Sequence, residues 1–552
     1  MSTIIPALAG VFAIAMIGFG LAFQGGITDT RWLVILGVAW LLLLVASRVR
    51  LPHSLPTFNR SLIRTTLVIA TVFIIISAQL VRIQVVQSDE TYFRTAADPD
   101  GEIIGNPRIG NSELAIERGN IVDRNGALIA GSERDGNVYI RTYPDPTTSY
   151  VAGYYSPLLY GSSGLEERYN EELVGQQGNN PFIRVTNNLL NRPQRGSDLQ
   201  LTLDSDLQAY ASQVLGDSNG SVVVMDVKTG AVLVLASNPS YDPNQLFTSD
   251  PGQRDAATAY WNSLLERPDA PLVVRSTMGL FSPGSIFKTV TAGIGIEAGY
   301  VEPDEIYEDT GELSIDGRVL VENNRPDPTR TEWTVTEGMA WSLNVVFAQI
   351  GLEIGATDYW ENAARFGFGK AIPFDVPVAI GQIASSQEFL RDNNALADTG
   401  FGQGEILVSP FQMALVTSMY VNDGKMMRPY LVETVLDDDG DATRTTTPEV
   451  WQQSISPDTA ADVEQMMIAA VQNGSASGAA IDGYTVGGKT GTAETGGGSA
   501  HSWFIGFIGE GESEPRYAVA VILENGNDTG RSATVAGRDV LLETIMSDPQ
   551  EG

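Results

Sequence analysis

Two stretches near the C-terminus decide the fold: Tyr484-Thr-Val-Gly-Gly-Lys-Thr-Gly-Thr-Ala493 and Trp503-Phe-Ile-Gly-Phe-Ile508. Their β-branched and aromatic residues favour strands, and Gly496-Gly-Gly-Ser499 between them favours a turn. The two stretches therefore predict neighbouring strands of one sheet. A further apolar run, residues 517–523, predicts one more strand.

The chain before these strands supplies the rest of the same domain. Residues 221–227 and 231–236 are apolar runs on either side of Lys228-Thr-Gly230, a combination that predicts a β-hairpin. Apolar spacing and helix-start signals predict helices at residues 285–298, 457–472 and 536–546. This order of elements predicts an α+β domain over residues 198–546, with helices on the faces of an antiparallel sheet. Residues 547–552 form a C-terminal tail.

The N-terminus carries three apolar runs, at about residues 4–23, 32–47 and 65–82. Each is close to the ~20 residues that a helix needs to span a bilayer. The second loop carries Arg48, Arg50, Arg60 and Arg64 and no acidic residue, which places it in the cytoplasm. We therefore expect residues 1–86 to hold three transmembrane helices of a multi-pass membrane protein whose later residues are extracytoplasmic. The alternative is a set of buried core helices.

Composition narrows the classes of function. The chain has 552 residues and no cysteine, which excludes disulfides and a thiol nucleophile. Its net charge of -33 repels nucleic acid, which is therefore not an expected partner. Residues 87–197 are polar and contain many Gly, Asn and Pro residues, so we expect an extended, β-containing pedestal there.

Ser285-Ile-Phe-Lys288 is the first candidate catalytic motif, because no other lysine of the chain follows a serine by three residues. On a helix, residues i and i+3 share a face, so a neutral amine can take the hydroxyl proton. That requires a pKa well below the ~10.4 of a free lysine, through burial or a second cation. A serine at a helix start also has free backbone N–H groups for a developing oxyanion. The alternative is a capping serine and an unrelated surface lysine.

Ser342-Leu-Asn344 is the second candidate motif. Its hydroxyl is suited to relaying protons, and its amide is suited to holding a substrate carbonyl. The alternative is a polar helix cap, because this spacing is common by chance.

Lys489-Thr-Gly-Thr492 is the third. On a strand, Lys489 and Gly491 point one way and Thr490 and Thr492 the other. The lysine would be the second cation beside Lys288, the hydroxyls would bind a carboxylate, and the glycine would let a substrate backbone come close. The alternative is an ordinary exposed strand end. Lys228-Thr-Gly230 repeats the pattern in a turn and before the serine, so we reject it as the catalytic copy.

Taken in order, S-x-x-K, S-x-N and K-T-G resemble the active site of penicillin-binding proteins and serine β-lactamases. The likeness to class B penicillin-binding proteins, which are monofunctional peptidoglycan D,D-transpeptidases, extends beyond the site, from about residue 85 to residue 546. The stretches that carry it are Glu117-Arg-Gly-Asn-Ile-Val-Asp-Arg-Asn-Gly126, Gly164-Leu-Glu-Glu-Arg-Tyr-Asn170, Asn238-Pro-Ser-Tyr-Asp-Pro-Asn244, Gly402-Gln-Gly-Glu-Ile-Leu-Val-Ser-Pro-Phe-Gln-Met413 and His501-Ser-Trp-Phe-Ile-Gly-Phe507.

The resemblance implies a chemistry for the motifs. Ser285 would attack the penultimate D-alanine of a peptidoglycan stem peptide, with Lys288 as general base. Ser342 and Lys489 would pass the proton to the leaving D-alanine, while Asn344 holds the peptide. An amine from a neighbouring stem peptide would then resolve the acyl-enzyme.

The resemblance also implies the binding groups. Thr490, Gly491 and Thr492 would contact the substrate, the two threonines binding the terminal carboxylate or that of a β-lactam antibiotic. The backbone N–H groups of Ser285 and Thr492 would form the oxyanion hole. No metal or cofactor is implied, and His501 is expected to be structural.

The chain departs from the family in its three apolar runs, where members usually have one. The two extra runs suggest a docking site for a polytopic peptidoglycan glycosyltransferase, in elongation or division of the cell wall. Four alternatives stay open: a D,D-carboxypeptidase, a β-lactamase, a β-lactam sensor and an inactive scaffold. A sensor would need a larger cytoplasmic domain than residues 48–64.

Overall fold

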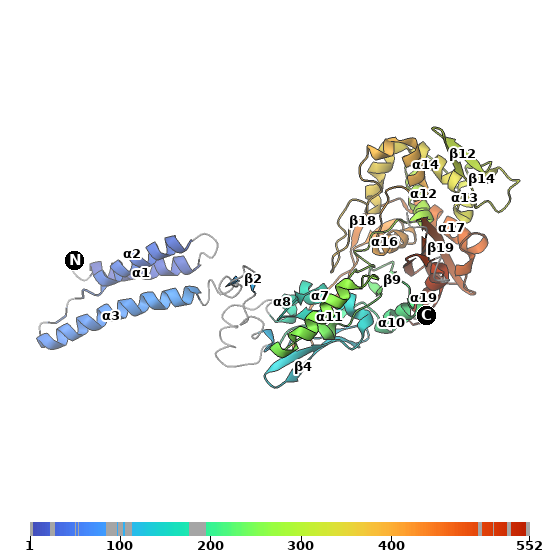
Figure 1. Ribbon diagram of the computed structural model, residues 1–552. Coiled ribbons are helices and arrows are strands. Elements are labelled where there is room, and N and C mark those ends of the chain that lie inside the picture. Colours follow the sequence, from blue (N-terminus) through green and yellow to red (C-terminus); the bar gives the residue numbers. More distant parts are fainter. Residues whose placement is uncertain are drawn as a thin grey trace. The chain divides into compact units, whose positions relative to one another are not determined.

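The computed structural model describes residues 4–22, 28–49, 51–52, 54–83, 96–97, 103–104, 113–175, 195–494, 499–511, 513–526 and 532–547. The described residues form two units, one before Leu114 and one from Leu114 onward (Figure 1).

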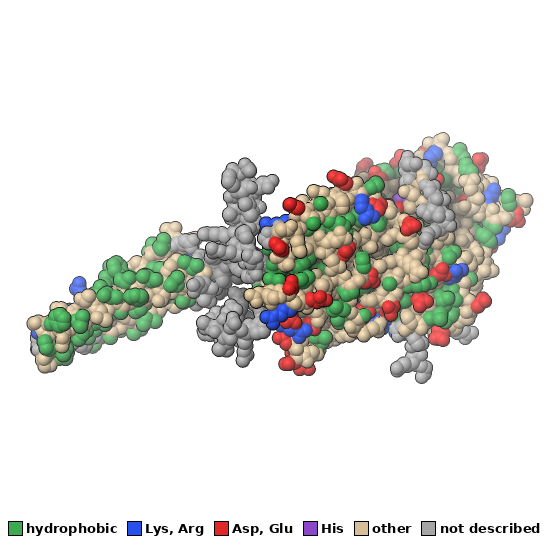
Figure 2. Space-filling view, turned by 60° about the horizontal axis from the view of Figure 1, so that its bottom comes forward, with side chains coloured by type: hydrophobic (Ala, Val, Ile, Leu, Met, Phe, Trp, Pro, Cys, Tyr) green, Lys and Arg blue, Asp and Glu red, His purple; other side chains and the backbone are tan. Residues whose placement is uncertain are grey.

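The first unit contains three apolar helices: α1 (Ile4–Ala22), α2 (Asp29–Ala46) and α3 (Thr57–Val81). Two of them, over Ile4–Leu21 and Thr57–Val81, are long and apolar enough to cross a membrane, and the apolar part of α2, Thr30–Ala46, is shorter. Hydrophobic side chains cover much of the visible surface of this unit, whereas many acidic side chains lie on the face of the other (Figure 2). The third helix begins eight residues before its predicted start, because its polar first turns do not contribute to the apolar run.

The second unit begins with the predicted pedestal, whose core is a sheet of six strands. The strands are β3 (Ile121–Val122), β4 (Leu128–Asp135), β5 (Val138–Thr142), β8 (Asp198–Leu201), β16 (Val432–Leu436) and β17 (Ala442–Thr445). Their order is β17-β16-β8-β3-β4-β5. The pedestal sheet therefore includes two strands from much later in the chain, which ties the pedestal to the domain that follows.

Two of the family-like stretches meet inside the pedestal. The Glu166 carboxylate, from the second stretch, accepts hydrogen bonds from Arg118 of the first at 2.7 Å and from Arg141 at 2.5 Å. Arg118 also donates to Asn170 at 2.7 Å. Gly119 has to be a glycine, since a Cβ there would lie 1.8 Å from the Ser197 carbonyl oxygen. The packing of the pedestal therefore explains why these residues occur in the two stretches, which the sequences alone do not reveal.

The main sheet of the second unit has five antiparallel strands in the order β10-β9-β21-β20-β19. They are β9 (Gly220–Asp226), β10 (Val232–Asn238), β19 (Tyr484–Glu494), β20 (Ala500–Glu510) and β21 (Tyr517–Leu523). Alternate residues of β9 enter two different hydrophobic clusters, Val222 and Val224 in one and Val223 and Met225 in the other. Helices cover both faces, and the predicted α+β class is confirmed.

One cluster includes side chains of α10 (Ser205–Leu215) and α19 (Ala533–Ser547). The other cluster includes side chains of the helices around the candidate site. These helices are α12 (Lys288–Glu297), α13 (Val335–Trp341), α14 (Asn344–Ala363), α16 (Pro410–Tyr420) and α17 (Pro457–Asn473). The N-cap of α17 is Ser456, whose side chain accepts from the Thr459 N–H, and Pro457 stands in the first turn.

Shorter elements complete the two units. The small two-stranded sheets are β1–β2 (Ala96–Ala97, Ile103–Ile104), β6–β7 (Tyr155–Ser156, Gly161–Ser162), β11–β14 (Ile306–Glu308, Glu332–Thr334), β12–β13 (Glu312–Ile315, Arg318–Val321) and β15–β18 (Lys425–Met427, Val450–Gln453). The remaining α-helices of the second unit are α6 (Ser149–Ala152), α7 (Gly164–Arg168), α8 (Asn170–Leu173), α11 (Arg254–Glu266) and α15 (Asn393–Gly400).

Candidate active site

Ser285 lies in a tight 3₁₀ turn, Gly284–Phe287, that leads into α12. Three residues per turn bring the side chains of residues i and i+3 into line, which serves the Ser285–Lys288 spacing better than an α-helix does. Gly284 has φ +57°, and a Cβ on it would lie 2.4 Å from the Thr492 carbonyl oxygen. The absence of a side chain at Gly284 therefore lets the serine turn lie directly against β19.

Lys288 is the first residue of α12 and is fully buried. Its Nζ donates to the Ser342 carbonyl at 2.6 Å, to Ser342 Oγ at 3.2 Å and to Asn344 Oδ1 at 2.8 Å. Three acceptors match the three N–H groups of an ammonium, so loss of a proton leaves a lone pair at this position. Within the described part of the chain, no hydrogen bond joins Ser285 to this amine.

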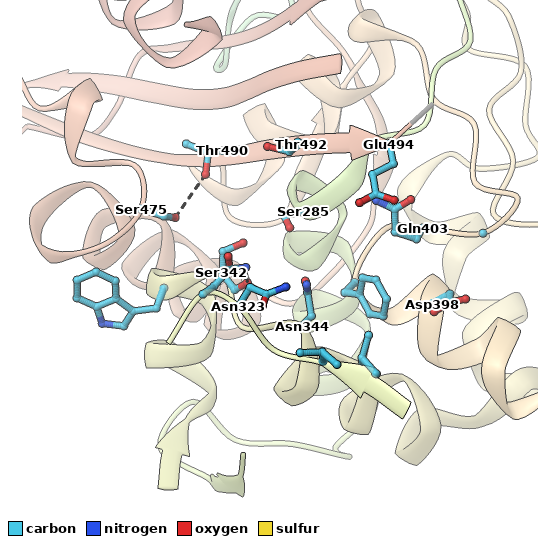
Figure 3. Close-up of a pocket in the computed structure, with 16 residues that line it drawn as sticks. Ser285, Asn323, Ser342, Asn344, Asp398, Gln403, Ser475, Thr490, Thr492 and Glu494 are labelled. Atoms are coloured by element: carbon cyan, nitrogen blue, oxygen red, sulfur yellow. Dashed lines mark hydrogen bonds between the residues drawn. The ribbon is translucent and has the colours of Figure 1, made fainter. Parts of the chain in front are cut away.

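Ser342 adopts a left-handed conformation, with φ 63°, between the end of α13 and the start of α14. This sharp junction turns both its carbonyl and its hydroxyl toward Lys288, and strain of this kind in a non-glycine residue is typical of functional sites. Asn344 begins α14. Because its Oδ1 accepts from Lys288, its Nδ2 is left as a donor at the cavity (Figure 3).

Lys489 is also fully buried, and it reaches the same hydroxyl from β19. Its Nζ donates to Ser342 Oγ at 2.8 Å and to the Thr490 carbonyl at 3.1 Å. One hydroxyl oxygen thus lies between two lysine amines. Burial lowers the pKa of Lys489 to about 7.

The pKa of Lys288 is held well below its ordinary value, first by burial and then by the positive charge of Lys489, while Glu322 opposes the shift. Burial and a second cation are the two causes expected from the sequence, and both act. Each lysine therefore loses its proton far more easily than a lysine in water, which is what a general base at neutral pH requires.

The site opens into a cavity of about 850 Å³. Figure 3 shows Ser285 between Thr490, Thr492 and Glu494 of β19 on one side and Ser342 and Asn344 on the other. The alternation predicted for this strand holds, since Thr490 and Thr492 line the cavity while Lys489 is buried. Among the residues that the structure describes, no group of three or more His, Asp or Glu side chains is placed to hold a metal ion.

Gly491 differs from expectation. It is buried, and a Cβ on it would lie 2.8 Å from the Pro283 carbonyl oxygen and 2.9 Å from Ile286. The close approach that this glycine allows is to the turn that carries Ser285, rather than to the cavity. Its role in the structure is to let β19 lie close to the turn that carries Ser285.

His501 and Lys228, which the sequence does not assign to catalysis, are not among the described residues that line the cavity. His501 Nδ1 accepts from the Asn525 N–H at 3.2 Å, and its ring packs on the edge of Phe281. Lys228 lies in the turn between β9 and β10, paired with Glu514 at 2.9 Å. Both arrangements agree with the structural roles expected for them.

The cavity also contains polar residues that sequence reasoning missed: Asn323, Asn324, Asp398, Gln403, Ser475 and Glu494. Ser475 shares a hydrogen bond of 3.4 Å with Thr490, and Asn324 donates to the Ser342 carbonyl at 2.9 Å. Only two of them gave a usable signal: Gln403 belongs to a family-like stretch, and Glu494 follows Thr492 by two residues on the same face of the strand.

Comparison with known proteins agrees with this geometry. Residues 220–546 match the family described as penicillin binding protein transpeptidase domain, and residues 118–199 match the penicillin binding protein A dimerisation domain. The peptidoglycan D,D-transpeptidase PbpA of Mycolicibacterium smegmatis is 32% identical over 484 residues, covering 85% of this chain and 94% of that protein. PbpA of Mycobacterium tuberculosis is 29% identical over 510 residues, covering 89% of this chain and all of that protein.

Solved structures give the same result. Penicillin-binding protein A from M. tuberculosis, as its imipenem acyl-enzyme complex, superposes with a TM-score of 0.72 at 30% identity, covering 79% of this chain and 99% of that one. The D,D-transpeptidase domain of a peptidoglycan glycosyltransferase from Eggerthella lenta has a TM-score of 0.68 at 30% identity, with coverage of 79% and 99%. The family model spans more than half of this chain, and the motifs occur in family order. The chain therefore belongs to the class B penicillin-binding proteins.

Proposed function

We propose that this chain is a serine peptidoglycan D,D-transpeptidase that cross-links stem peptides in bacterial cell-wall synthesis, with Ser285 as the acylated residue. The observation that carries the proposal is the placement of Ser342 Oγ between two buried amines, Lys288 Nζ at 3.2 Å and Lys489 Nζ at 2.8 Å. A proton relay of this kind, on the wall of a cavity that also contains Ser285, suits acyl transfer.

In the acylation step, neutral Lys288 takes the Ser285 proton as Oγ attacks the carbonyl carbon of the penultimate D-alanine. The C–O bond to Ser285 forms, and the C–N bond to the last D-alanine breaks. The proton passes through Ser342, with Lys489 beside it, to the departing amine. An amine of a second stem peptide then attacks the ester, forms the cross-link and releases Ser285 with its proton restored.

Three further groups would position the substrate. Asn344 Nδ2 faces the cavity as a donor for a peptide carbonyl. Thr490 and Thr492 line the same wall and would bind the terminal carboxylate of the stem peptide, or that of a β-lactam. The backbone N–H groups of Ser285 and Thr492 would stabilise the oxyanion, since the packing of Gly284 on β19 brings these residues together. Gly491 would serve the site by allowing that packing.

The proposed setting is the bacterial cell membrane, with residues 1–86 spanning it three times and the catalytic domain outside the cytoplasm. Two helices long enough to cross support a membrane anchor, and the shorter apolar helix Thr30–Ala46 would be the remaining span. The arginines between residues 48 and 64 support a cytoplasmic position for that part of the chain. Residues 87–197 would be the pedestal and residues 198–546 the transpeptidase domain, with β16 and β17 returning to the pedestal sheet. The substrates would be stem peptides on lipid-linked precursor strands.

The two additional helices, α1 and α2, would dock a polytopic peptidoglycan glycosyltransferase. Trp32 of α2 is buried and donates to Gln79 of α3 at 2.6 Å, so the added helices pack on the third. Co-purification with such a partner, lost on deletion of residues 1–60, would support the proposal. Association that survives the deletion would contradict it.

Labelling with a fluorescent penicillin tests the catalytic proposal. We expect the wild-type chain to form a stable covalent adduct and Ser285→Ala to form none, because the ester has no other attachment point. Ser282→Ala is the control, since the contact of this neighbouring serine with Trp503 is made by its backbone carbonyl. Failure of the wild type to be labelled would sink the proposal, and rapid turnover of the drug would indicate a β-lactamase instead.

A further inference from the structure

Glu322 lies behind the Ser342–Asn344 segment, directly after β13. Its side chain is 6% exposed. One oxygen accepts from the backbone N–H of Val345, in the first turn of α14, at 3.0 Å, and the other accepts from the N–H of Asn324 at 2.9 Å. A carboxylate at a helix N-terminus is stabilised by the free N–H groups and the helix dipole there. Glu322 therefore fixes the start of α14 and the turn that holds Asn324.

Asn324 and the start of α14, which Glu322 fixes, are both connected to Lys288 through hydrogen bonds. Asn324 Nδ2 donates at 2.9 Å to the Ser342 carbonyl, the same oxygen that accepts from Lys288 Nζ at 2.6 Å. On the other side, α14 begins with Asn344, whose Oδ1 accepts from Lys288 at 2.8 Å. All the acceptors of Lys288 Nζ therefore belong to a segment that Glu322 holds at two points.

The electrostatic interactions of Lys288 also indicate a role for Glu322. Lys288 and Lys489 are both buried, and Glu322 is the buried carboxylate whose charge acts on Lys288, raising its pKa against burial and Lys489. Asp309, directly after β11, lies near Glu322 and Arg325, and burial raises its pKa, with a further contribution from Glu322. The charged groups around the site are thus Lys489 and Glu322 beside Lys288, Asp309 and Arg325 near Glu322, and Asp398 and Glu494 on the cavity wall.

We propose that Glu322 is a positioning residue for acylation of Ser285: it holds the acceptors of Lys288 in place and supplies the negative charge that acts on Lys288 in its buried position. The inference rests on the proposed function, because it concerns the base of that reaction. Glu322 would affect the reaction through Lys288, without contact with the substrate.

The test is the pH profile of the acylation rate constant with a fluorescent penicillin, measured on the detergent-solubilised full chain. Acylation needs neutral Lys288, so the acidic limb reports the pKa of the coupled lysine pair. Glu322→Gln removes the charge that raises this pKa, so its acidic limb should move to lower pH. Its plateau rate should fall about tenfold or more, because one backbone N–H loses a charged acceptor.

Two further variants separate charge from structure. Glu322→Asp keeps the charge and shortens the reach, so its acidic limb should stay at the wild-type pH while the plateau rate falls. Glu337→Gln is the matched control: Glu337 also accepts a backbone N–H at the start of a helix leading to Ser342, at 2.9 Å from Thr334 N, but it is not among the groups acting on Lys288. Its limb should not move.

Three results would each overturn the inference. The acidic limb of Glu322→Gln could coincide with that of wild type, or the acidic limb of Glu322→Asp could shift as far in pH as that of Glu322→Gln. The third such result is an acidic limb of Glu337→Gln that shifts by the same amount. If Glu322→Gln does not fold, Asn324→Ala carries the test, with a tenfold lower plateau expected and an unchanged one overturning it. Failure of the proposed function is recognised separately, since the wild type would then form no adduct at Ser285.

Discussion

The pedestal and the active site each contain two buried cations beside one buried carboxylate, and they differ in the kind of cation. In the pedestal, Glu166 is fully buried and accepts from Arg118, Arg141 and the Tyr143 hydroxyl, at 2.7, 2.5 and 3.1 Å. Burial alone would raise the pKa of Glu166, but the charges of Arg141 and Arg118 hold it below its ordinary value. The carboxylate pairs directly with both cations.

In the active site, the corresponding trio is Lys288, Lys489 and Glu322. The two lysines share the hydroxyl of Ser342, and the carboxylate lies one step further away, bonded to backbone N–H groups. Within the described part of the chain, neither lysine forms a direct ion pair with Glu322. Burial lowers the pKa of both lysines, that of Lys489 to about 7, and the charge of Lys489 lowers the pKa of Lys288 further.

The difference separates an ion cluster with one charge state from one that can give up a proton. Arginine stays protonated in proteins and forms fixed planar bonds to a carboxylate, so the pedestal cluster has one charge state and holds two chain segments together. Lysine titrates readily when it is buried without a partner of opposite charge, so the active-site cluster gives up a proton near neutral pH.

Exchanging the cation type in the active site should have the largest effect. Lys288→Arg keeps the positive charge but cannot supply a lone pair, so acylation by a fluorescent penicillin should slow by about 10²–10⁴-fold. Lys288→Met, which is neutral and similar in length, controls for the added bulk and should lose as much. An arginine variant that acylates at the wild-type rate would show that Lys288 is not the base.

Removing the carboxylate from the pedestal cluster should affect stability rather than chemistry. Glu166→Gln leaves two buried arginines without a counter-charge, so the free energy of unfolding should fall by about 3–5 kcal/mol. Chemical denaturation measures this, with the exposed neighbour in Glu167→Gln as control. The folded fraction should still label with fluorescent penicillin at the wild-type rate. A loss of labelling rate that exceeds the loss of folded protein would contradict the structural role.

The sequence predicted the two buried lysines of the site better than their surroundings. Lys288 and Lys489 follow from short motifs, and the strand period placed Thr490 and Thr492 on the cavity side, as observed. Glu322 could not be predicted, because its role depends on a turn after β13 that returns to the start of α14. Motif spacing carries information along one element, whereas this contact joins two elements through backbone N–H groups.

The same limit explains the pedestal. Arg118 and Glu166 lie in stretches that resemble the family, but the sequence gives no physical reason for that resemblance. Only the fold shows that the two residues form one ion cluster. The strands at 432–445 carry no signal that assigns them to the pedestal, because a strand's partner is set by tertiary packing rather than by its own sequence. The antiparallel sheet with helices on its faces was therefore predictable from the sequence, and its connection to the pedestal was not.

The smallest expected effect concerns the free energy of unfolding that is lost because the charge of Lys489 is buried. Burial holds the pKa of Lys489 at about 7 in the folded chain, against about 10.4 for a free lysine. Below pH 7 both folded and unfolded chains carry this proton, and the full penalty of burying the charge is present. Between pH 7 and about 10 the folded chain has lost the proton that the unfolded chain keeps, so this group's contribution to stability rises with pH.

Lys489→Met removes that penalty, so the variant should melt a few degrees above wild type at pH 6.5, and the gain should shrink at pH 9, while acylation falls. Comparing the two chains at each pH cancels the titration of all other groups. Lys370→Met, which removes an exposed lysine, should change the melting temperature equally at both pH values. A Met variant that melts below wild type at pH 6.5 would mean that hydrogen bonds from Lys489 outweigh the burial of its charge. The active-site trio would then be a stabilising cluster like the one in the pedestal.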